Sequence, residues 1–329
     1  MQSDTPPSAN PDNHTFDQTE HMENAARRID NISSHLAAQP CAGNYPKGLL
    51  AGEVAIITGS GDVSSVFGSQ GIGKSCAMLF AKEGAYVVVT DIDNGTICSR
   101  CPLNHENQIR TGKSDAVAAD INAAGGKAIS VPGDVLDASF PDRLINETIK
   151  AFGKINHIVN NAGFTWDGML HKLTDKQWDV MLAVHNTAPF RIVKAAAPHM
   201  ISSTSGLHGN IGQANYATAK AGIVGLTKTI AKEWGAFGVR ANTVAFGYIE
   251  TRLTQAKEAG AFIEVEGKKV ALGIPQGAAK AAPVNQFADI PLGRTGSPDD
   301  AAGGVLMLCT PFANYVTGHT LEVTGGKGI

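Results

Sequence analysis

The feature that most constrains the fold is an alternation of short, β-branched, apolar runs with helical segments. Residues 53–58 read EVAIIT and residues 86–90 read YVVVT, with a helical pattern over residues 72–82 between them. Runs that are apolar on both faces are typical of strands inside a parallel sheet, and parallel strands need a crossover connection such as a helix. The sequence therefore predicts an α/β fold with a doubly wound parallel sheet of the Rossmann type in a single domain.

The same patterns predict the remaining elements. Further strands are expected at residues 128–131, 155–160, 239–246 and 319–323, and helices at residues 115–124, 174–197 and 213–234. Another helix is predicted to begin after Ser297, because a serine cap, a first-turn proline and two early acidic residues favour a helix start. Residues 1–48 are polar and predict a disordered or helical arm before a domain of residues 49–329.

Composition excludes several classes of protein. The formal net charge is −3, so no strongly basic surface is available for nucleic acid or an anionic membrane. No apolar run approaches the ~20 residues of a membrane-spanning helix. The five cysteines are too few and too scattered for a disulfide scaffold, which favours a cytoplasmic location. Cys98, Cys101 and His105 do not make the four ligands of a zinc site, so no metal is expected.

A glycine-rich turn follows the first strand. Gly59 ends that strand, and Gly71, Ile72 and Gly73 open the next helix. Glycines let the backbone approach a pyrophosphate, and a helix N-terminus supplies amide donors. Asp91 follows the second strand, near the ~20-residue spacing of a carboxylate that binds the adenosine ribose. A 2′-phosphate would meet the like charge of Asp91, so NAD is favoured over NADP.

Tyr216 and Lys220 stand four residues apart in a predicted helix and therefore share one face. A neighbouring ammonium is expected to lower the pKa of the phenol and make it a general acid or base. Such spacing is common by itself, and a surface pair is the alternative interpretation. Residues 160–163 (NNAG) follow the fourth strand, at the carboxyl edge where open α/β sheets bind ligands. The Tyr216–Lys220 pair, residues 160–163 and Ser203 together favour an active site.

In this order the motifs resemble the short-chain dehydrogenase/reductase family over residues 49–329. The resemblance implies a hydride-transferring oxidoreductase that acts on a carbonyl or alcohol group and forms a homo-oligomer, a dimer or a homotetramer. The catalytic residues that it implies are Asn186, Ser203, Tyr216 and Lys220. The cofactor-binding residues that it implies are Gly59, Gly71, Ile72, Gly73, Asp91, Asp134, Val135, Asn161, Ala162, Gly163, Tyr216, Lys220, Gly247, Ile249 and Thr251.

The resemblance also assigns roles. Ser203 hydrogen-bonds the substrate oxygen, Tyr216 exchanges its proton, and Lys220 holds the nicotinamide ribose. Asn186 seats a water in the proton relay, Asp134 contacts adenine, and Thr251 contacts the carboxamide or the pyrophosphate. Residues 167–178 and 212–216 look most like 3-oxoacyl-[acyl-carrier-protein] reductases of fatty acid metabolism. A 3-oxoacyl thioester is the expected substrate, with other alcohols, steroids or hydroxyacyl-CoA as alternatives.

The chain departs from the family pattern at four places. Residues 62–69 interrupt the glycine-rich loop, and residues 94–111 form a second insertion. Between the predicted helix end near Ala197 and Ser203 only residues 198–202 remain, so the central strand that carries Ser203 is predicted to be truncated. Phe246 replaces a proline. These departures support the hypothesis of a splice or gene-model variant that only binds or oligomerises. Residues 253–284 are predicted to form a substrate lid.

Overall fold

The structure, a computed structural model, describes residues 48–61, 71–92, 112–197, 214–251, 254, 262–265, 268–271 and 289–328. The chain divides into two compact units, residues 1–44 and 45–329, and every described residue belongs to the second. The predicted arm therefore lies outside the described residues, apart from Gly48. The apparent insertions at residues 62–69 and 94–111 also lie outside them.

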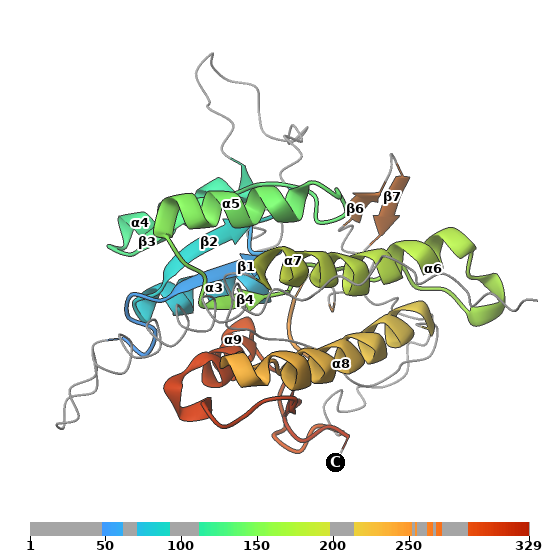
Figure 1. Cartoon of the computed structure of the whole chain (residues 1–329). Coiled ribbons are helices and arrows are strands. Elements are labelled where there is room, and N and C mark those ends of the chain that lie inside the picture. Colours follow the sequence, from blue (N-terminus) through green and yellow to red (C-terminus); the bar gives the residue numbers. More distant parts are fainter. Residues whose placement is uncertain are drawn as a thin grey trace, which may run out of the picture. The chain divides into compact units, whose positions relative to one another are not determined.

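The first half of the domain is built on a four-stranded parallel sheet (Figure 1). Its strands are β1 (Val54–Thr58), β2 (Tyr86–Thr90), β3 (Lys127–Ser130) and β4 (His157–Val159), in the order β3-β2-β1-β4. Ile56 of β1 stands opposite Val88 of β2 on one side and Ile158 of β4 on the other. All five residues of β1 are buried, as expected for a central parallel strand.

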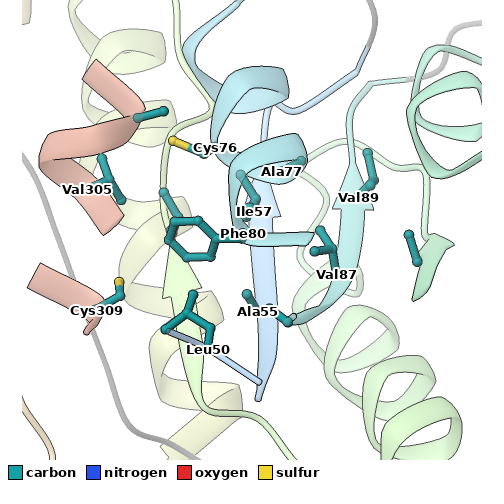
Figure 2. Packing of buried hydrophobic residues seen from close by; sticks show 14 of the residues in the cluster. Leu50, Ala55, Ile57, Cys76, Ala77, Phe80, Val87, Val89, Val305 and Cys309 are labelled. Carbon is teal, nitrogen blue, oxygen red and sulfur yellow. The ribbon is translucent and has the colours of Figure 1, made fainter. Parts of the chain in front are cut away.

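Helices cover both faces of this sheet, which confirms the doubly wound architecture. On one face α3 (Ile72–Lys82), α4 (Lys113–Ala123) and α9 (Pro298–Cys309) enclose a core that includes Ala55 and Ile57. Figure 2 shows Phe80 of α3 in that core, among Leu50, Val305 and Cys309. On the other face α5 (Phe140–Phe152), α7 (Ala188–Ala196) and α8 (Ala214–Trp234) pack around Ile56, because successive strand residues point to opposite faces.

A second parallel pair is formed by β5 (Thr243–Phe246) and β8 (Thr320–Val323). In the part of the chain that the structure describes, no strand is hydrogen-bonded between β4 and β5. The predicted truncated strand with Ser203 falls in residues 198–213, outside the described residues. Within the predicted lid, β6 (Phe262–Val265) and β7 (Lys268–Ala271) form an antiparallel hairpin.

Several elements differ from the sequence prediction. The helix predicted over residues 174–197 consists of α6 (Asp175–Leu182), a π-helical turn η2 (Ala183–Thr187) and α7. The predicted strand over residues 239–246 begins only at Thr243, because Ala241 and Asn242 hydrogen-bond with the loop before β8 instead of a ladder. Helix α5 is not predicted at all. Short 3-10 turns lie at Leu170–Lys172 (η1), Gly235–Phe237 (η4) and Pro311–Ala313 (η6).

Other predictions are confirmed at the level of single residues. Helix α3 spans the predicted residues 72–82. The Ser297 side chain caps α9 by accepting a hydrogen bond from the Asp300 amide at 3.1 Å, and Asp300 closes a capping box. None of the helices in the described ranges is long and apolar enough to cross a membrane.

Candidate active site

The glycine turn after β1, the start of α3 and the loop after β4 pack directly on one another. A Cβ atom on Gly73 would lie 2.3 Å from the Gly59 carbonyl oxygen, and one on Gly59 would lie 2.8 Å from the Ala162 Cα atom. Asn161 fastens the contact, because its Nδ2 donates to the carbonyl oxygens of Thr58 at 3.0 Å and Gly59 at 3.1 Å. Four predicted cofactor residues are thus brought together at the carboxyl end of the sheet.

Within the described residues, the start of α3 has the features of an anion-binding helix end. Gly71 is the N-cap residue and supplies no side-chain cap, and the first turn holds no acidic residue. The next predicted residues, Ile72 and Gly73, therefore place backbone amides at an uncapped, positively polarised helix end. This is the arrangement that binds phosphate groups in dinucleotide-binding folds.

Asp91 lies directly after β2, beside the glycine turn. Its Oδ2 accepts a hydrogen bond from the Gly61 amide at 2.9 Å, and its Oδ1 accepts one from the Ile92 amide at 2.8 Å. The Asp91 carbonyl accepts from Gly133, which precedes the predicted adenine contact Asp134 and the predicted cofactor residue Val135. Asp134 in turn accepts from the Leu136 amide at 2.8 Å. The predicted adenosine contacts therefore adjoin the glycine turn.

Tyr216 and Lys220 lie near the beginning of α8, on one face of the helix. Asn215 anchors this helix start to the α6 region, because its Nδ2 donates to the carbonyls of Trp166 at 3.3 Å and Gln177 at 3.1 Å. The Lys220 Nζ atom lies 5.4 Å from the centre of the Tyr216 ring, a cation–π contact. The two residues therefore share one helix face, as their spacing predicts.

The prediction that Lys220 lowers the pKa of Tyr216 is wrong for the protein without its cofactor. Burial, followed by the charge of Asp167, raises the pKa of Tyr216 to about 12. Burial also lowers the pKa of Lys220 to about 8. Lys220 lies over the aromatic ring, and desolvation of the phenolate is the main cause of the raised pKa of Tyr216. At neutral pH the Tyr216 phenol holds its proton.

Asn186 and His185 enter the site from the π-helical turn η2. Asn186 Nδ2 donates to the Ala219 carbonyl at 2.9 Å, which ties the turn to α8. The His185 ring meets the Tyr216 ring edge to face, with centroids 5.0 Å apart. A Cβ atom on Gly163 would lie 2.3 Å from His185 Cε1. His185 was missed by the sequence reasoning, although a histidine between Val184 and Ala188 on a buried helix face is a usable signal.

Four side-chain atoms are buried without a hydrogen-bond partner among the described residues. They are Thr90 Oγ1, Asn160 Oδ1, His185 Nδ1 and Asn186 Oδ1. Thr90 ends β2, Asn160 follows β4, and the other two come from η2 beside Tyr216. Because buried polar atoms normally have a partner, open acceptors gathered at one end of the sheet are typical of a ligand site. With the uncapped helix end, these residues fit a nicotinamide dinucleotide.

The remaining predicted residues are placed as follows. Gly247 follows β5 and donates to the Val323 carbonyl of β8 at 2.9 Å, and a Cβ atom there would lie 2.8 Å from Thr324 Cα. Ile249 makes a β-bridge with Gly296, and the Thr251 amide donates to Thr254 Oγ1 at 2.9 Å. Of these three residues, Gly247 is the one that bonds to β8. Ser203 lies outside the described residues.

Comparison with known proteins decides the family. The short chain dehydrogenase family matches residues 53–261. The chain is 36% identical to a 3-oxoacyl-[acyl-carrier-protein] reductase of Synechocystis, over 84% of this chain and 97% of that protein. It is 31% identical to the corresponding reductase FabG of Thermotoga maritima, over 84% and 98%. This chain is a short-chain dehydrogenase.

Solved structures agree with this assignment. A dehydrogenase/reductase of Sinorhizobium meliloti superposes with a TM-score of 0.63 at 28% identity, covering 85% of this chain and 96% of that chain. A Serratia marcescens short-chain dehydrogenase/reductase gives the same TM-score at 27% identity. As a member of this family, the chain is an oxidoreductase of carbonyl and alcohol groups that uses a nicotinamide cofactor.

Proposed function

We propose that this short-chain dehydrogenase reduces 3-oxoacyl thioesters to 3-hydroxyacyl thioesters with NADH. The observation that carries the proposal is the protonated Tyr216, held beside Lys220 at the carboxyl end of a sheet whose glycine turn fits a dinucleotide. Its likeness to 3-oxoacyl-[acyl-carrier-protein] reductases of Synechocystis and Thermotoga maritima supports the choice of substrate.

In this proposal the chain's residues handle the proton. The bound cofactor supplies the hydride. Tyr216 donates its phenolic proton to the carbonyl oxygen as charge develops there, which a phenol with a raised pKa does at neutral pH. Lys220, a partly buried cation beside the ring, favours the phenolate that remains. Ser203 is proposed to orient the substrate oxygen and Asn186 to seat a water for reprotonation.

The proposed cofactor preference rests on Asp91. Both carboxylate oxygens already accept backbone amides, so the negative charge is fixed at the end of β2. We expect NADH to bind more tightly than NADPH, and Asp91→Ser to raise NADPH affinity about tenfold by removing the like charge. Fluorescence titration of both cofactors measures this, with Asp115→Ser as a control on neighbouring α4. Tighter NADPH binding by the unmodified chain would contradict the preference.

A second candidate function has one observation in its favour. Helix α7 ends at Ala196, so few residues remain before Ser203 for the central strand that the family resemblance implies. A chain that binds the nicotinamide cofactor without turnover would fit this shortage. NADH binding and NADH oxidation in the presence of a 3-oxoacyl thioester, on CoA and on acyl-carrier protein, separate the two. Turnover supports the reductase, and binding without turnover supports the second candidate.

Three further proposals follow the family resemblance. Residues 253–284, which include the β6–β7 hairpin, are proposed to close over the substrate. The protein is proposed to act in the cytoplasm as a homo-oligomer, either a dimer or a homotetramer. Sedimentation of the full chain tests the oligomer, and a monomer at micromolar concentration would contradict it.

A further inference from the structure

One buried group of the site has no role in the chemistry above. His185 is 4% exposed and lies between two predicted functional elements, the loop after β4 and helix α8. On one side its ring meets Tyr216 edge to face. On the other side it fills the space beside Gly163, where a Cβ atom would lie 2.9 Å from His185 Nδ1. The imidazole therefore sets the spacing between the tyrosine and the cofactor loop.

The hydrogen bonds of His185 define its tautomer. Its Nε2 lies 2.8 Å from the Phe164 carbonyl oxygen. A carbonyl only accepts, so Nε2 carries the proton, and in a neutral ring Nδ1 is then an acceptor. That acceptor is buried and has no partner among the described residues. Burial first, then the nearby Lys220, lowers the pKa of His185 to about 3, so the ring is neutral at physiological pH.

The charges around His185 indicate which group could donate a hydrogen bond to Nδ1. Lys220 is the charged group that acts on His185, and Asp167 acts on Tyr216, while residues 160–164 of the β4 loop are uncharged. The Lys220 ammonium has three donors and makes no hydrogen bond within the described residues. A water molecule between Lys220 Nζ and His185 Nδ1 would satisfy both groups, since buried waters bridge such partners.

We propose that His185 is a positioning residue of the reductase site: it fixes Tyr216 against the cofactor loop and holds Lys220 through one water on Nδ1. This inference rests on the proposed function for its catalytic meaning, but its geometry is measurable without turnover. The water bond stabilises the Lys220 ammonium. Removing the acceptor therefore makes Lys220 easier to deprotonate.

The test uses two variants and a matched control. His185→Phe keeps the ring edge and removes Nδ1, whereas His185→Asn supplies a side-chain acceptor and loses ring contact. Val184→Ala is the control, because Val184 is a buried neighbour in the same π turn that carries no polar group. Nitrogen NMR of the protein without cofactor should show His185 neutral and protonated at Nε2 near pH 7.

Lys220 is followed by carbon NMR of labelled lysine, with Lys220→Arg to assign the signal. We expect His185→Phe to lower its titration midpoint by about one pH unit and Val184→Ala to leave it unchanged. In an active enzyme the alkaline limb of the turnover profile moves by the same amount, and His185→Asn restores part of the shift. An imidazolium at pH 7, or equal midpoints in His185→Phe and Val184→Ala, would overturn the inference. Absent turnover with the expected NMR result would instead overturn the proposed function.

Discussion

The two ends of the parallel sheet differ in whether their buried polar groups have hydrogen-bond partners. At the amino end, His157 contacts Glu53, and the Val54 amide donates to Asn156 Oδ1 at 2.9 Å. At the carboxyl end, Thr90, Asn160, His185 and Asn186 each keep a buried atom without a partner among the described residues. A polar cluster whose hydrogen bonds are all made stabilises the fold, whereas buried polar atoms without a partner are typical of a ligand site. Substitutions at the two ends should therefore damage different properties.

The largest effect is expected at the carboxyl end. Tyr216→Phe removes the proton donor but keeps the ring against His185, so turnover should fall by about 10²–10⁴. NADH affinity and the free energy of unfolding should change little. Steady-state kinetics with a 3-oxoacyl thioester measure the loss. Tyr86→Phe, the same chemical change on β2, is the control and should keep full activity. Equal activity in both variants would remove Tyr216 from the mechanism.

At the amino end the expected damage is to stability. His157→Ala leaves the Glu53 carboxylate buried without its partner imidazole, and breaking such a buried pair costs about 3–5 kcal/mol of unfolding free energy. Denaturant unfolding measures the cost. NADH affinity should persist below the transition, because the pair lies at the far end of β4 from Asn160. A loss of affinity in folded His157→Ala protein would break the contrast between the two ends.

A smaller effect is expected where the backbone is tightly packed. Gly73→Ala forces a Cβ atom against the Gly59 carbonyl and should cost about 1–3 kcal/mol and weaken NADH binding. Gly303→Ala, at an exposed position of α9, has no atom within 4 Å of the added Cβ and should instead stabilise by about 0.5–1 kcal/mol. Thermal unfolding and NADH titration compare the two variants. Equal changes in unfolding temperature and NADH affinity in the two variants would show that the contact between Gly73 and Gly59 is not rigid.

The contrast also explains what the sequence could predict. β1, α3 and the Ser297 cap follow from local signals: β-branched runs, a glycine start and a capping box. Helix α5 also has such signals in Ser139, Pro141 and Gly153. The π turn that presents His185 has no local signature, and the bond from Asn186 of this turn to the Ala219 carbonyl of α8 joins residues 33 positions apart.

The sequence predicts where Tyr216 and Lys220 lie, but it does not predict the pKa of Tyr216. The spacing of Tyr216 and Lys220 places them on one helix face, as the structure confirms. Spacing does not reveal how deeply the phenol is buried, and burial is the main reason that its pKa rises rather than falls. Ser203 and the connection between β4 and β5 remain predictions, since they lie outside the described residues.

The pH dependence of stability should have opposite signs at the two ends. Burial alone would lower the pKa of His157, but Cys309 and Glu53 outweigh it and raise the pKa to about 10. The stability from protonated His157 is therefore complete below about pH 6.5 and is lost as the pH rises toward 10. Lys220 acts oppositely, because burial lowers its pKa to about 8. Its folded form loses the proton first, so stability increases from about pH 8 until the unfolded lysine also titrates.

Two variants separate these contributions, which partly cancel in the unmodified chain. The double variant Glu53→Gln with His157→Gln removes the amino-end loss, so its unfolding free energy should rise with pH above about 8. Lys220→Met removes the carboxyl-end gain, so its unfolding free energy should fall more steeply than that of the unmodified chain between about pH 8 and 10. Denaturant midpoints across this range measure both slopes. Parallel slopes in the two variants would mean that the ends of the sheet do not titrate independently, since each variant leaves only the other end's group to respond.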